Sequence, residues 1–286
     1  MISNQNISVV IPSIGTRDLT PTIKSLNSST IKIDEIIVSV PYDIEIELFE
    51  KFSNIIVHKS KYKGQVAQRI EGFKIAKNKF IVQIDDDIIL EKNCLEIMRD
   101  FIKKNHKIAV SAHFHDVISK KSIYSNVNHQ IFSNFSFLSA LKYFNNKIKT
   151  ANNSNLNGDI SISGFETYPN FQDHNKPFVS GWIPGGCVMH LKKNLILYNF
   201  FPFQGKAYCE DLFHSIALKN NNIQLYYHPK AKAFLEIDNI KSNLKMFIGH
   251  LRADFKIRQK LVEQNNLSKS RMFLVYLIKL FSYLFK

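Results

Sequence analysis

The sequence is poor in cysteine and in long apolar runs. Cys94, Cys187 and Cys209 are an odd number, are widely spaced and form no CxxC pair. This pattern argues against a disulfide framework and against a zinc site, so we expect reduced, structural thiols. The run RMFLVYLIKLFSYLF has about fifteen mostly apolar residues and is broken by Lys279, whereas a helix needs ~20 residues to span a bilayer. A membrane-spanning helix is therefore not expected.

The N-terminus lacks the pattern of a secretory signal peptide. MISNQNISVVIPS joins no basic start to an apolar segment and a small-residue cleavage site, so we expect it to form a first strand. The sequence also contains no internal repeat, no interleaved aromatic and basic strand motif and no helix-turn-helix pattern. We therefore expect no nucleic-acid partner, despite the basic composition.

Basic residues outnumber acidic ones, and the excess concentrates in the C-terminal tail. The formal net charge is +14, and residues 241–286 contribute ten Lys or Arg against Asp254 and Glu263, a net +8. Basic residues around an apolar, aromatic helix suit an anionic membrane surface. The alternative is a helix packed on its own domain or on a second subunit. We favour the membrane, and expect a cytoplasmic protein held peripherally at its inner face.

The first half of the chain alternates two periodicities. Strands are expected at 7–11, 35–40, 54–58, 79–84 and 107–114. Helices are expected at 44–52, 65–76 and 92–104. A further helix is expected after Thr20, interpreted as a cap that precedes Pro21 at the first helical position. Strands and helices that alternate across short connections predict an α/β fold with a parallel sheet covered on both faces.

The second half is less regular. Residues 115–178 are rich in Asn, Ser, Phe and Lys with weak periodicity, and we expect a long excursion over the active face. FVSGWIPGGCVMHL predicts a loop followed by a strand, and Glu210 to Lys219 predicts a helix. NIQLYYH and AKAFLEI are interpreted as two closing strands. Helical patterning dominates from Ile240 onward.

Three adjacent carboxylates, Asp85, Asp86 and Asp87, follow the strand-like FIVQI. Adjacent carboxylates repel each other unless a cation neutralises them, and Mg²⁺ and Mn²⁺ are commonly held by one or two carboxylates together with substrate phosphates. Side chains alternate at a strand end, so Asp85 and Asp87 can face one site while Asp86 turns aside. The alternative is an acidic turn that caps the following segment.

Five motifs in order resemble those of family 2 glycosyltransferases of the GT-A fold, across roughly residues 5 to 236. VVIPSIGTR resembles the opening strand and turn, KGQVAQRIEGF the glycine, alanine and arginine helix, and QIDDDI the DxD motif. GWIPGGCVMH resembles the acceptor-side strand and loop, and YCEDLFHSIAL the ED helix. The resemblance implies an α/β fold with a central, mostly parallel, Rossmann-like sheet flanked by helices, here followed by a C-terminal helical extension.

The resemblance also implies a division of the chain and of its site. Residues 1–114 would bind the nucleotide sugar, 115–238 the acceptor, and 239–286 would form the basic amphipathic tail. The expected donor-binding residues are Pro12, Ser13, Arg17, Gly64, Arg69, Asp85 and Asp86. Asp87, supported by Asp85, is the expected ligand of a Mn²⁺ or Mg²⁺ ion that absorbs charge on the departing diphosphate.

Catalytic and acceptor roles follow from the same resemblance. Asp211 is the expected base that takes the acceptor proton, with Glu210 orienting the acceptor, and one direct displacement implies inversion. Trp182, Gly185 and Gly186 are the expected acceptor residues. Alternatives remain for individual residues. Glu210 and Asp211 would also favour a helix N-terminus, Arg69 would also pair with Glu71 or another carboxylate, and Trp182 would also fit a core.

Two positions depart from the family pattern. Val40 and Pro41 stand where an acidic residue often contacts the base, with Asp43 later, so the nucleotide is not predicted. His228 lies earlier than the family's histidine and receives no ligand role.

We expect a metal-dependent transferase that moves a sugar from a nucleotide diphosphate to a saccharide, lipid-linked in view of the tail, in surface-glycan synthesis such as capsule or O-antigen. One alternative is a nucleotidyltransferase, disfavoured by the single glycine and arginine of PSIGTRDLTPT. The other is a noncatalytic cationic membrane-surface protein, which leaves Asp85, Asp87 and Asp211 unexplained.

Overall fold

A computed structural model describes residues 7–43, 52–124, 158–168, 171, 175–203, 207–236 and 243–284. The helix expected at 44–52 and most of the excursion expected at 115–178 lie outside the described residues. The chain forms two compact units. Unit 1 comprises Met1–Ser122, His174–Val179 and Ile183–Ile237, and unit 2 comprises Ile123–Asp173, Ser180–Trp182 and Asp238–Lys286.

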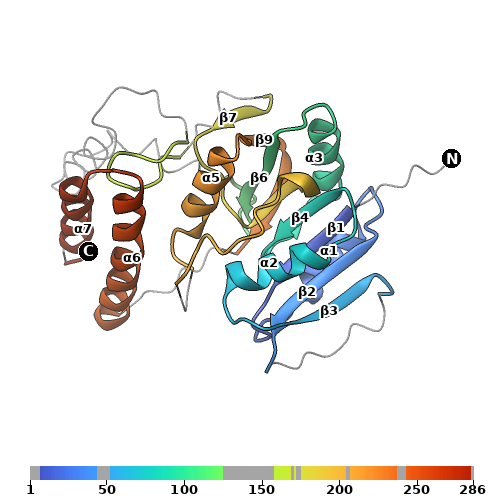
Figure 1. Cartoon of the computed structure of the whole chain (residues 1–286), viewed down its shortest axis with the longest axis horizontal. Coiled ribbons are helices and arrows are strands. Elements are labelled where there is room, and N and C mark those ends of the chain that lie inside the picture. Colours follow the sequence, from blue (N-terminus) through green and yellow to red (C-terminus); the bar gives the residue numbers. More distant parts are fainter. Residues whose placement is uncertain are drawn as a thin grey trace. The chain divides into compact units, whose positions relative to one another are not determined.

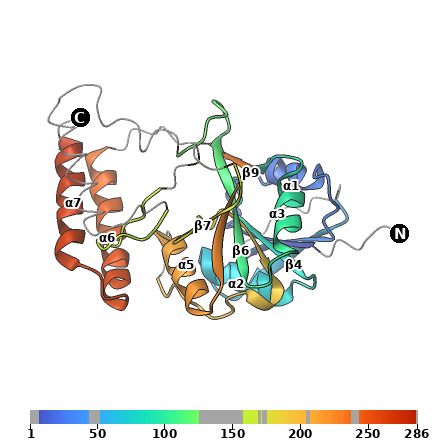
Figure 2. The same ribbon diagram turned by 90° about the horizontal axis from the view of Figure 1, so that it is seen from above.

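Four strands of unit 1 form a parallel half-sheet in the order β3-β2-β1-β4, side by side in Figure 1. They are β1 (Ile7–Pro12), β2 (Glu35–Pro41), β3 (Ile55–Ser60) and β4 (Phe80–Ile84). The helices between and after them are α1 (Thr20–Asn27), α2 (Gln65–Ile75) and α3 (Cys94–Ile102). Figure 2 shows α1 and α3 on one face of the sheet and α2 on the other. The carboxyl ends of these strands therefore meet at one edge.

The sheet continues past β4 with mixed pairing. The further strands are β5 (Ile89–Leu90), β6 (Ile108–Asp116), β7 (Phe178–Ser180), β8 (Cys187–Leu191) and β9 (Gln224–Leu235). β8 runs antiparallel to both β4 and β6, and β9 runs parallel to β6. Helix α5 (Glu210–Asn220) connects β8 to β9. The α/β fold with a large central sheet flanked by helices, predicted from the sequence, is confirmed.

Two local predictions are wrong. The two expected closing strands form one strand, β9, whose pairing with β6 jumps from Ala112↔His228 to His113↔Lys232. The extra residues bulge out, which accommodates Pro229 without a break because proline has no N–H to donate to a ladder. Thr20 is not a cap: it is already helical, and its backbone N–H donates to Asp18 Oδ1 at 2.8 Å.

Helix α2 packs very closely on the sheet. Phe73 and Ala76 join Val10, Ile37 and Ile81 in one buried cluster. At Gly72 a side chain would collide with Val10, so this position requires glycine. The close approach fixes the helix, and with it the polar residues of its first two turns, over the carboxyl ends of the strands.

Unit 2 contains a helical hairpin, α6 (Leu244–Gln264) and α7 (Lys269–Leu284). Phe165 from the segment 158–168 packs with Val262 of α6 and with Met272, Val275 and Tyr276 of α7. In the part of the chain that the structure describes, no helix is both long and apolar enough to cross a membrane. The tail thus packs one face on its own unit, as one of the two sequence interpretations predicted.

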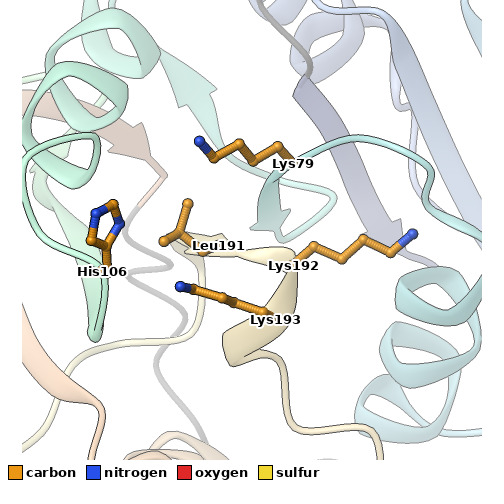
Figure 3. Close-up of a pocket in the computed structure, with 5 residues that line it drawn as sticks. All are labelled: Lys79, His106, Leu191, Lys192 and Lys193. Carbon is orange, nitrogen blue, oxygen red and sulfur yellow. The ribbon is translucent and has the colours of Figure 1, made fainter.

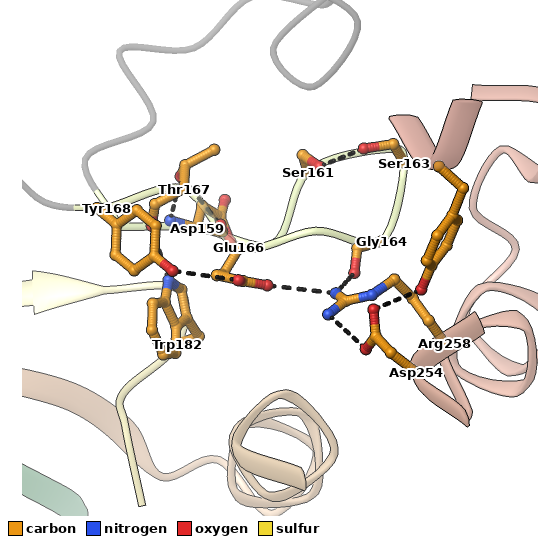
Figure 4. A network of polar contacts seen from close by, with 11 residues as sticks. Asp159, Ser161, Ser163, Gly164, Glu166, Thr167, Tyr168, Trp182, Asp254 and Arg258 are labelled. Atoms are coloured by element: carbon orange, nitrogen blue, oxygen red, sulfur yellow. Dashed lines mark hydrogen bonds and ion pairs between the residues drawn. The ribbon is translucent and has the colours of Figure 1, made fainter. Parts of the chain in front are cut away.

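A buried arginine joins the hairpin to the segment 158–168 (Figure 4). Arg258 donates to the Gly164 carbonyl at 2.6 Å and to Glu166 Oε2 at 3.2 Å, and it pairs with Asp254 Oδ1 at 3.1 Å. The Tyr276 hydroxyl donates to the other oxygen of Asp254 at 2.6 Å. Because a buried cation needs such partners, this network makes the hairpin a structural part of unit 2.

Candidate functional site

Asp85 directly follows β4, and both its backbone and its side chain are held by hydrogen bonds. Its backbone N–H donates to the Gly186 carbonyl at 3.0 Å. Its Oδ1 accepts hydrogen bonds from Gln65 Nε2 at 2.9 Å and from Arg69 Nη2 at 3.1 Å, both on α2. Among the described residues no hydrogen bond reaches Asp85 Oδ2, which leaves this oxygen for a ligand.

Asp86 and Asp87 point to different partners, as the alternation at a strand end requires. Asp86 accepts from the Ser13 hydroxyl at 2.7 Å, and its carbonyl accepts from Thr22 at 3.1 Å. Asp87 Oδ2 pairs with Arg17 at 3.1 Å, and both side chains reach solvent. Partial burial and the charges of Asp85 and Asp86 raise the pKa of Asp87, and Arg17 offsets this only in part.

Arg69 lies beneath the site and joins its two acidic motifs. The side chain is 1% exposed, and it donates to Glu210 Oε1 at 2.9 Å as well as to Asp85. Burial alone would lower its pKa, but the charges of Glu210 and Asp85 outweigh burial and raise it. Glu71 pairs instead with Lys74. Arg69 therefore positions the two carboxylates, and it does not line the cleft in which we expected it to meet a nucleotide.

Glu210 and Asp211 form the first turn of α5, which follows Cys209 in the left-handed region at φ 46°. Such a backbone is uncommon for a residue other than glycine. Glu210 is buried, and its Oε2 has no hydrogen-bond partner within the described residues. Burial and the neighbouring Glu210 carboxylate raise the pKa of Asp211 well above its ordinary value, against the charge of Arg69. Asp211 is thus suited to accept a proton.

Gly185 and Gly186 pass directly over these carboxylates. A Cβ at Gly185 would lie 2.8 Å from Glu210 Oε1 and 3.1 Å from Asp211 Oδ1. A Cβ at Gly186 would lie 3.4 Å from Asp85 Oδ2. The Gly185 carbonyl accepts from Gln83 Nε2 at 2.7 Å, so β4 holds this loop in place. The two glycines therefore allow the loop's close approach to both acidic motifs.

Three glutamines of the site were not predicted from the sequence. Gln68 Nε2 donates to the carbonyls of Ser13 and Ser39, both at 2.7 Å, and its Oε1 accepts from the Gly64 N–H. Gln65 and Gln83 hold Asp85 and Gly185, as described above. Two sequence features could have indicated them. Gln65, Gln68 and Arg69 are spaced i, i+3 and i+4 along α2, which places three polar residues on one side of the helix, and Gln83 interrupts an otherwise apolar strand.

A cleft of about 930 Å³ opens beside the three aspartates. It is lined by Pro12, Ser13, Ile14, Lys61, Tyr62, Lys63, Gly64, Gln65, Gln68, Asp85, Asp86, Asp87 and Ala207. The expected donor residues Pro12, Ser13 and Gly64 are therefore brought together with the aspartates. Gly64 has φ 137°, a conformation that favours glycine. Lys61 and Lys63 were not predicted, and they add positive charge to a cleft that the three aspartates also line.

Trp182 lies in unit 2 and agrees with the core interpretation. Its ring is 4% exposed, and its Nε1 donates to the Thr167 carbonyl at 2.8 Å. Tyr168 packs edge-on against it at 5.9 Å, and the Tyr168 hydroxyl donates to Glu166 (Figure 4). A ring held in this way is not presented to a sugar, in contrast to the acceptor-binding role expected for it.

The aspartates could hold a divalent cation only if substrate oxygens completed its coordination. Within the described ranges, no group of three or more His, Cys, Asp or Glu side chains forms a ready-made metal site. Asp85 Oδ2 and the solvent-accessible Asp87 still offer carboxylate oxygens at the edge of the cleft. Mg²⁺-type ions are commonly held by one or two carboxylates with phosphate oxygens supplying further ligands.

Comparison with solved structures identifies the fold. Many solved structures are similar to this chain, and two illustrate the likeness. The crystal structure of GalNAc-T7 with UDP, GalNAc and Mn²⁺ has a TM-score of 0.58 at 15% identity, over 83% of this chain and 44% of that one. The crystal structure of S. aureus TarS 1-349 has a TM-score of 0.53 at 13% identity, over 97% of this chain and 71% of that one. This chain thus spans less than half the length of GalNAc-T7.

At the level of sequence, no curated protein matches the chain significantly. A family profile does match: residues 8–165, more than half of the chain, fit the profile described as Glycosyl transferase family 2. The matched segment includes β1, α2 and the three aspartates, the same elements that build the cleft. The chain therefore belongs to glycosyl transferase family 2.

Proposed function

We propose that this protein is an inverting, divalent-metal-dependent glycosyltransferase that moves a sugar from a nucleotide diphosphate to a saccharide hydroxyl. The observation that carries the proposal is the bridge from Asp85 through buried Arg69 to Glu210. The bridge places the acidic ends of β4 and α5 at one edge of the sheet, beside a cleft of about 930 Å³. The transfer proposed here uses one acid to bind the donor and its metal and another to activate the acceptor.

The donor would lie in the cleft, with its diphosphate near Asp85 and Asp87. A cation held there by both carboxylates would absorb charge that develops on the leaving diphosphate. Lys61 and Lys63 line the same cleft, and their cations suit the phosphates. Ser13 and Gly64 would approach the nucleotide. Val40 is buried and carries no polar group for the base.

Asp211 would act as the base on the acceptor. A hydroxyl is a weak nucleophile until its proton is taken during attack, and a carboxylate of raised pKa takes it more readily than an ordinary one. Glu210, fixed by Arg69, would orient the acceptor, and its negative charge raises the pKa of Asp211. A single displacement by this hydroxyl inverts the anomeric carbon.

Asp87→Asn is expected to abolish transfer and to weaken Mn²⁺-dependent donor binding by at least about tenfold, because one charged ligand of the cation is lost. A thermal-shift panel of nucleotide sugars with and without Mn²⁺ first finds the donor, and calorimetry then compares the variant with the native protein. Asp100→Asn, on the exposed side of α3 in an ion pair with the buried Arg99, is the control outside the cleft and should bind metal and donor as the native protein does. Metal-dependent binding of native strength in Asp87→Asn would remove it as a ligand.

The acceptor is proposed to be lipid-linked, in the synthesis of a surface glycan such as capsule or O-antigen, with the protein cytoplasmic and peripheral at the membrane. This part is supported by the face of α7 that unit 2 leaves open. Phe273, Leu274 and Phe281 are 53%, 44% and 48% exposed, and Lys269 and Arg271 lie at the start of the same helix. Apolar side chains beside cations suit an anionic bilayer surface.

Phe273→Ser/Phe281→Ser is expected to reduce binding to anionic vesicles by at least about tenfold, since each phenylalanine gains roughly 1.5–3 kcal/mol on burial. Cosedimentation with vesicles measures this. Point variants are preferable to deletion of 270–286, which would also remove Met272, Val275 and Tyr276 from the core of unit 2. Leu197→Ser/Tyr198→Ser, two exposed residues of unit 1, is the control. Equal binding by both double variants would contradict the membrane role of α7.

A further inference from the structure

A second pocket of unit 1 is lined mainly by cationic side chains. It has a volume of about 450 Å³ and is formed by Lys79, His106, Leu191, Lys192 and Lys193. It lies at the opposite edge of the sheet from the aspartates, because Phe80 at the start of β4 pairs with Leu191 at the end of β8. The six residue steps from Lys79 through β4 to Asp85 separate the two sites by roughly 20 Å at ~3.3 Å per residue.

Hydrogen bonds fix the three segments that form this pocket. The Lys192 backbone N–H donates to the Lys79 carbonyl at 2.9 Å, which joins the end of β8 to the start of β4. Asn194, in the short 3-10 helix η2 (Lys192–Asn194), is buried and donates through Nδ2 to the His106 carbonyl at 2.9 Å. The backbones that carry the cationic side chains are therefore held in place by the fold itself.

The side chains converge on one space. Figure 3 shows the amino groups of Lys79 and Lys193 and the ring of His106 around Leu191, whereas the amino group of Lys192 is directed away from them. Within the described residues, none of the three lysines forms an ion pair with an acidic side chain. Converging cations with no acidic partner repel each other and attract an anion.

We propose that Lys79, Lys193 and His106 form a binding site for a phosphate group, separate from the donor cleft. Lysine binds phosphate as a point charge, and the imidazole of His106 has ring nitrogens that can donate or accept a hydrogen bond. At about 450 Å³ the pocket falls in the size range of small-molecule sites, so the phosphate would be carried by a larger group. That group is a soluble phosphate ester or the headgroup of an anionic lipid, which share this chemistry.

The direct test is calorimetric titration of the full chain with pyrophosphate in the presence of EDTA, so that metal-dependent binding in the donor cleft is excluded. Lys79→Gln/Lys193→Gln is expected to weaken pyrophosphate binding by at least about tenfold. Lys24→Gln/Lys32→Gln removes two charges from exposed positions of unit 1 and should bind as native. Equal pyrophosphate binding by the two double variants would overturn the proposal. It would also be overturned if the native chain bound no pyrophosphate at moderate salt and Lys79→Gln/Lys193→Gln bound the phosphatidic acid vesicles described next as the unsubstituted protein does.

A vesicle arm distinguishes the two sources of phosphate. Vesicles of phosphatidic acid in phosphatidylcholine are compared with phosphatidylcholine alone, with and without free pyrophosphate. These measurements use the Phe273→Ser/Phe281→Ser background, which reduces vesicle binding through α7. Loss of phosphatidic acid binding when Lys79→Gln/Lys193→Gln is added, with competition by pyrophosphate only at high concentration, assigns the site to a lipid headgroup. Pyrophosphate binding with unchanged vesicle binding assigns it to a soluble ester. In either case Mn²⁺-dependent donor binding should be native in the variant, since the aspartates lie at the other edge.

Discussion

Asp211→Asn is expected to lower sugar transfer by about 10²–10⁴-fold, the usual contribution of a general base, while Mn²⁺-dependent donor binding is retained. The amide has nearly the size of the carboxylate but cannot take the acceptor proton. Steady-state transfer and calorimetry of donor binding are measured on the same preparation. Near-native turnover would remove Asp211 as the base.

The raised pKa of Asp211 separates this loss from misfolding. A carboxyl whose pKa is higher in the folded than in the unfolded chain favours folding at low pH, and that contribution is lost as pH rises through the folded pKa. Asparagine carries no such charge, so Asp211→Asn should unfold at an equal or higher temperature than the native protein near neutral pH. An inactive variant that also unfolds earlier would point to structural damage.

The same pKa sets the pH profile. A base works only when deprotonated, so transfer by the native enzyme should fall toward acid with its midpoint above the ordinary range of aspartate, because burial and Glu210 raise the pKa of Asp211. The residual activity of Asp211→Asn should lack this acid limb. The comparison tests the role of the residue itself, since a merely structural aspartate would leave the pH profile in place.

Local periodicity predicted the sheet well because its strands are short apolar runs. The runs at 7–11, 35–40 and 54–58 became β1, β2 and β3, shifted or extended by one or two residues. The fusion of two expected strands into β9 was not predictable from periodicity, since the bulge that admits Pro229 is decided by pairing with β6. Strand existence is a local property, whereas strand continuity depends on the partner.

The contacts of the site were still harder to predict from the local sequence. The sequence predicted that Asp85, Asp87, Glu210 and Asp211 carry the chemistry, from three adjacent carboxylates after a strand and from the resemblance of QIDDDI and YCEDLFHSIAL to family motifs. It offered an ion pair between Arg69 and a carboxylate as one of two alternatives, but it did not identify Asp85 and Glu210 as the partners. Glu210 lies 141 positions further along the chain, and only the fold brings the two together. The roles of Gln68 and Gln83 likewise depend on the backbone carbonyls to which their side chains donate hydrogen bonds, and only the fold brings these groups together.

Arg69→Met is expected to destabilise the protein by about 3–5 kcal/mol, the usual cost of breaking a buried ion pair from one side. Methionine fills much of the space but leaves Glu210 buried and Asp85 half-buried without their cation. The midpoint temperature of thermal unfolding should fall by roughly 10 °C. The difference in stability from the native protein should shrink as pH falls, since protonation removes the uncompensated charges. Lys74→Met, on the same helix in an exposed pair with Glu71, is the control and should cost less than about 1 kcal/mol.

A second substitution tests whether the charge, and not the shape, of Arg69 is what unit 1 needs. In Arg69→Met/Glu210→Gln the buried carboxylate is neutralised together with its cation, so part of the lost stability should return, because a buried pair removed from both sides costs less than one broken from one side. Transfer should stay low in the double variant, since Asp85 and the start of α5 are no longer tied to one guanidinium. If the double variant were as unstable as Arg69→Met, packing would hold the site together and the bridge would be incidental. Recovery of stability without activity would instead show that the same ion pair stabilises the fold and aligns the donor and acceptor acids.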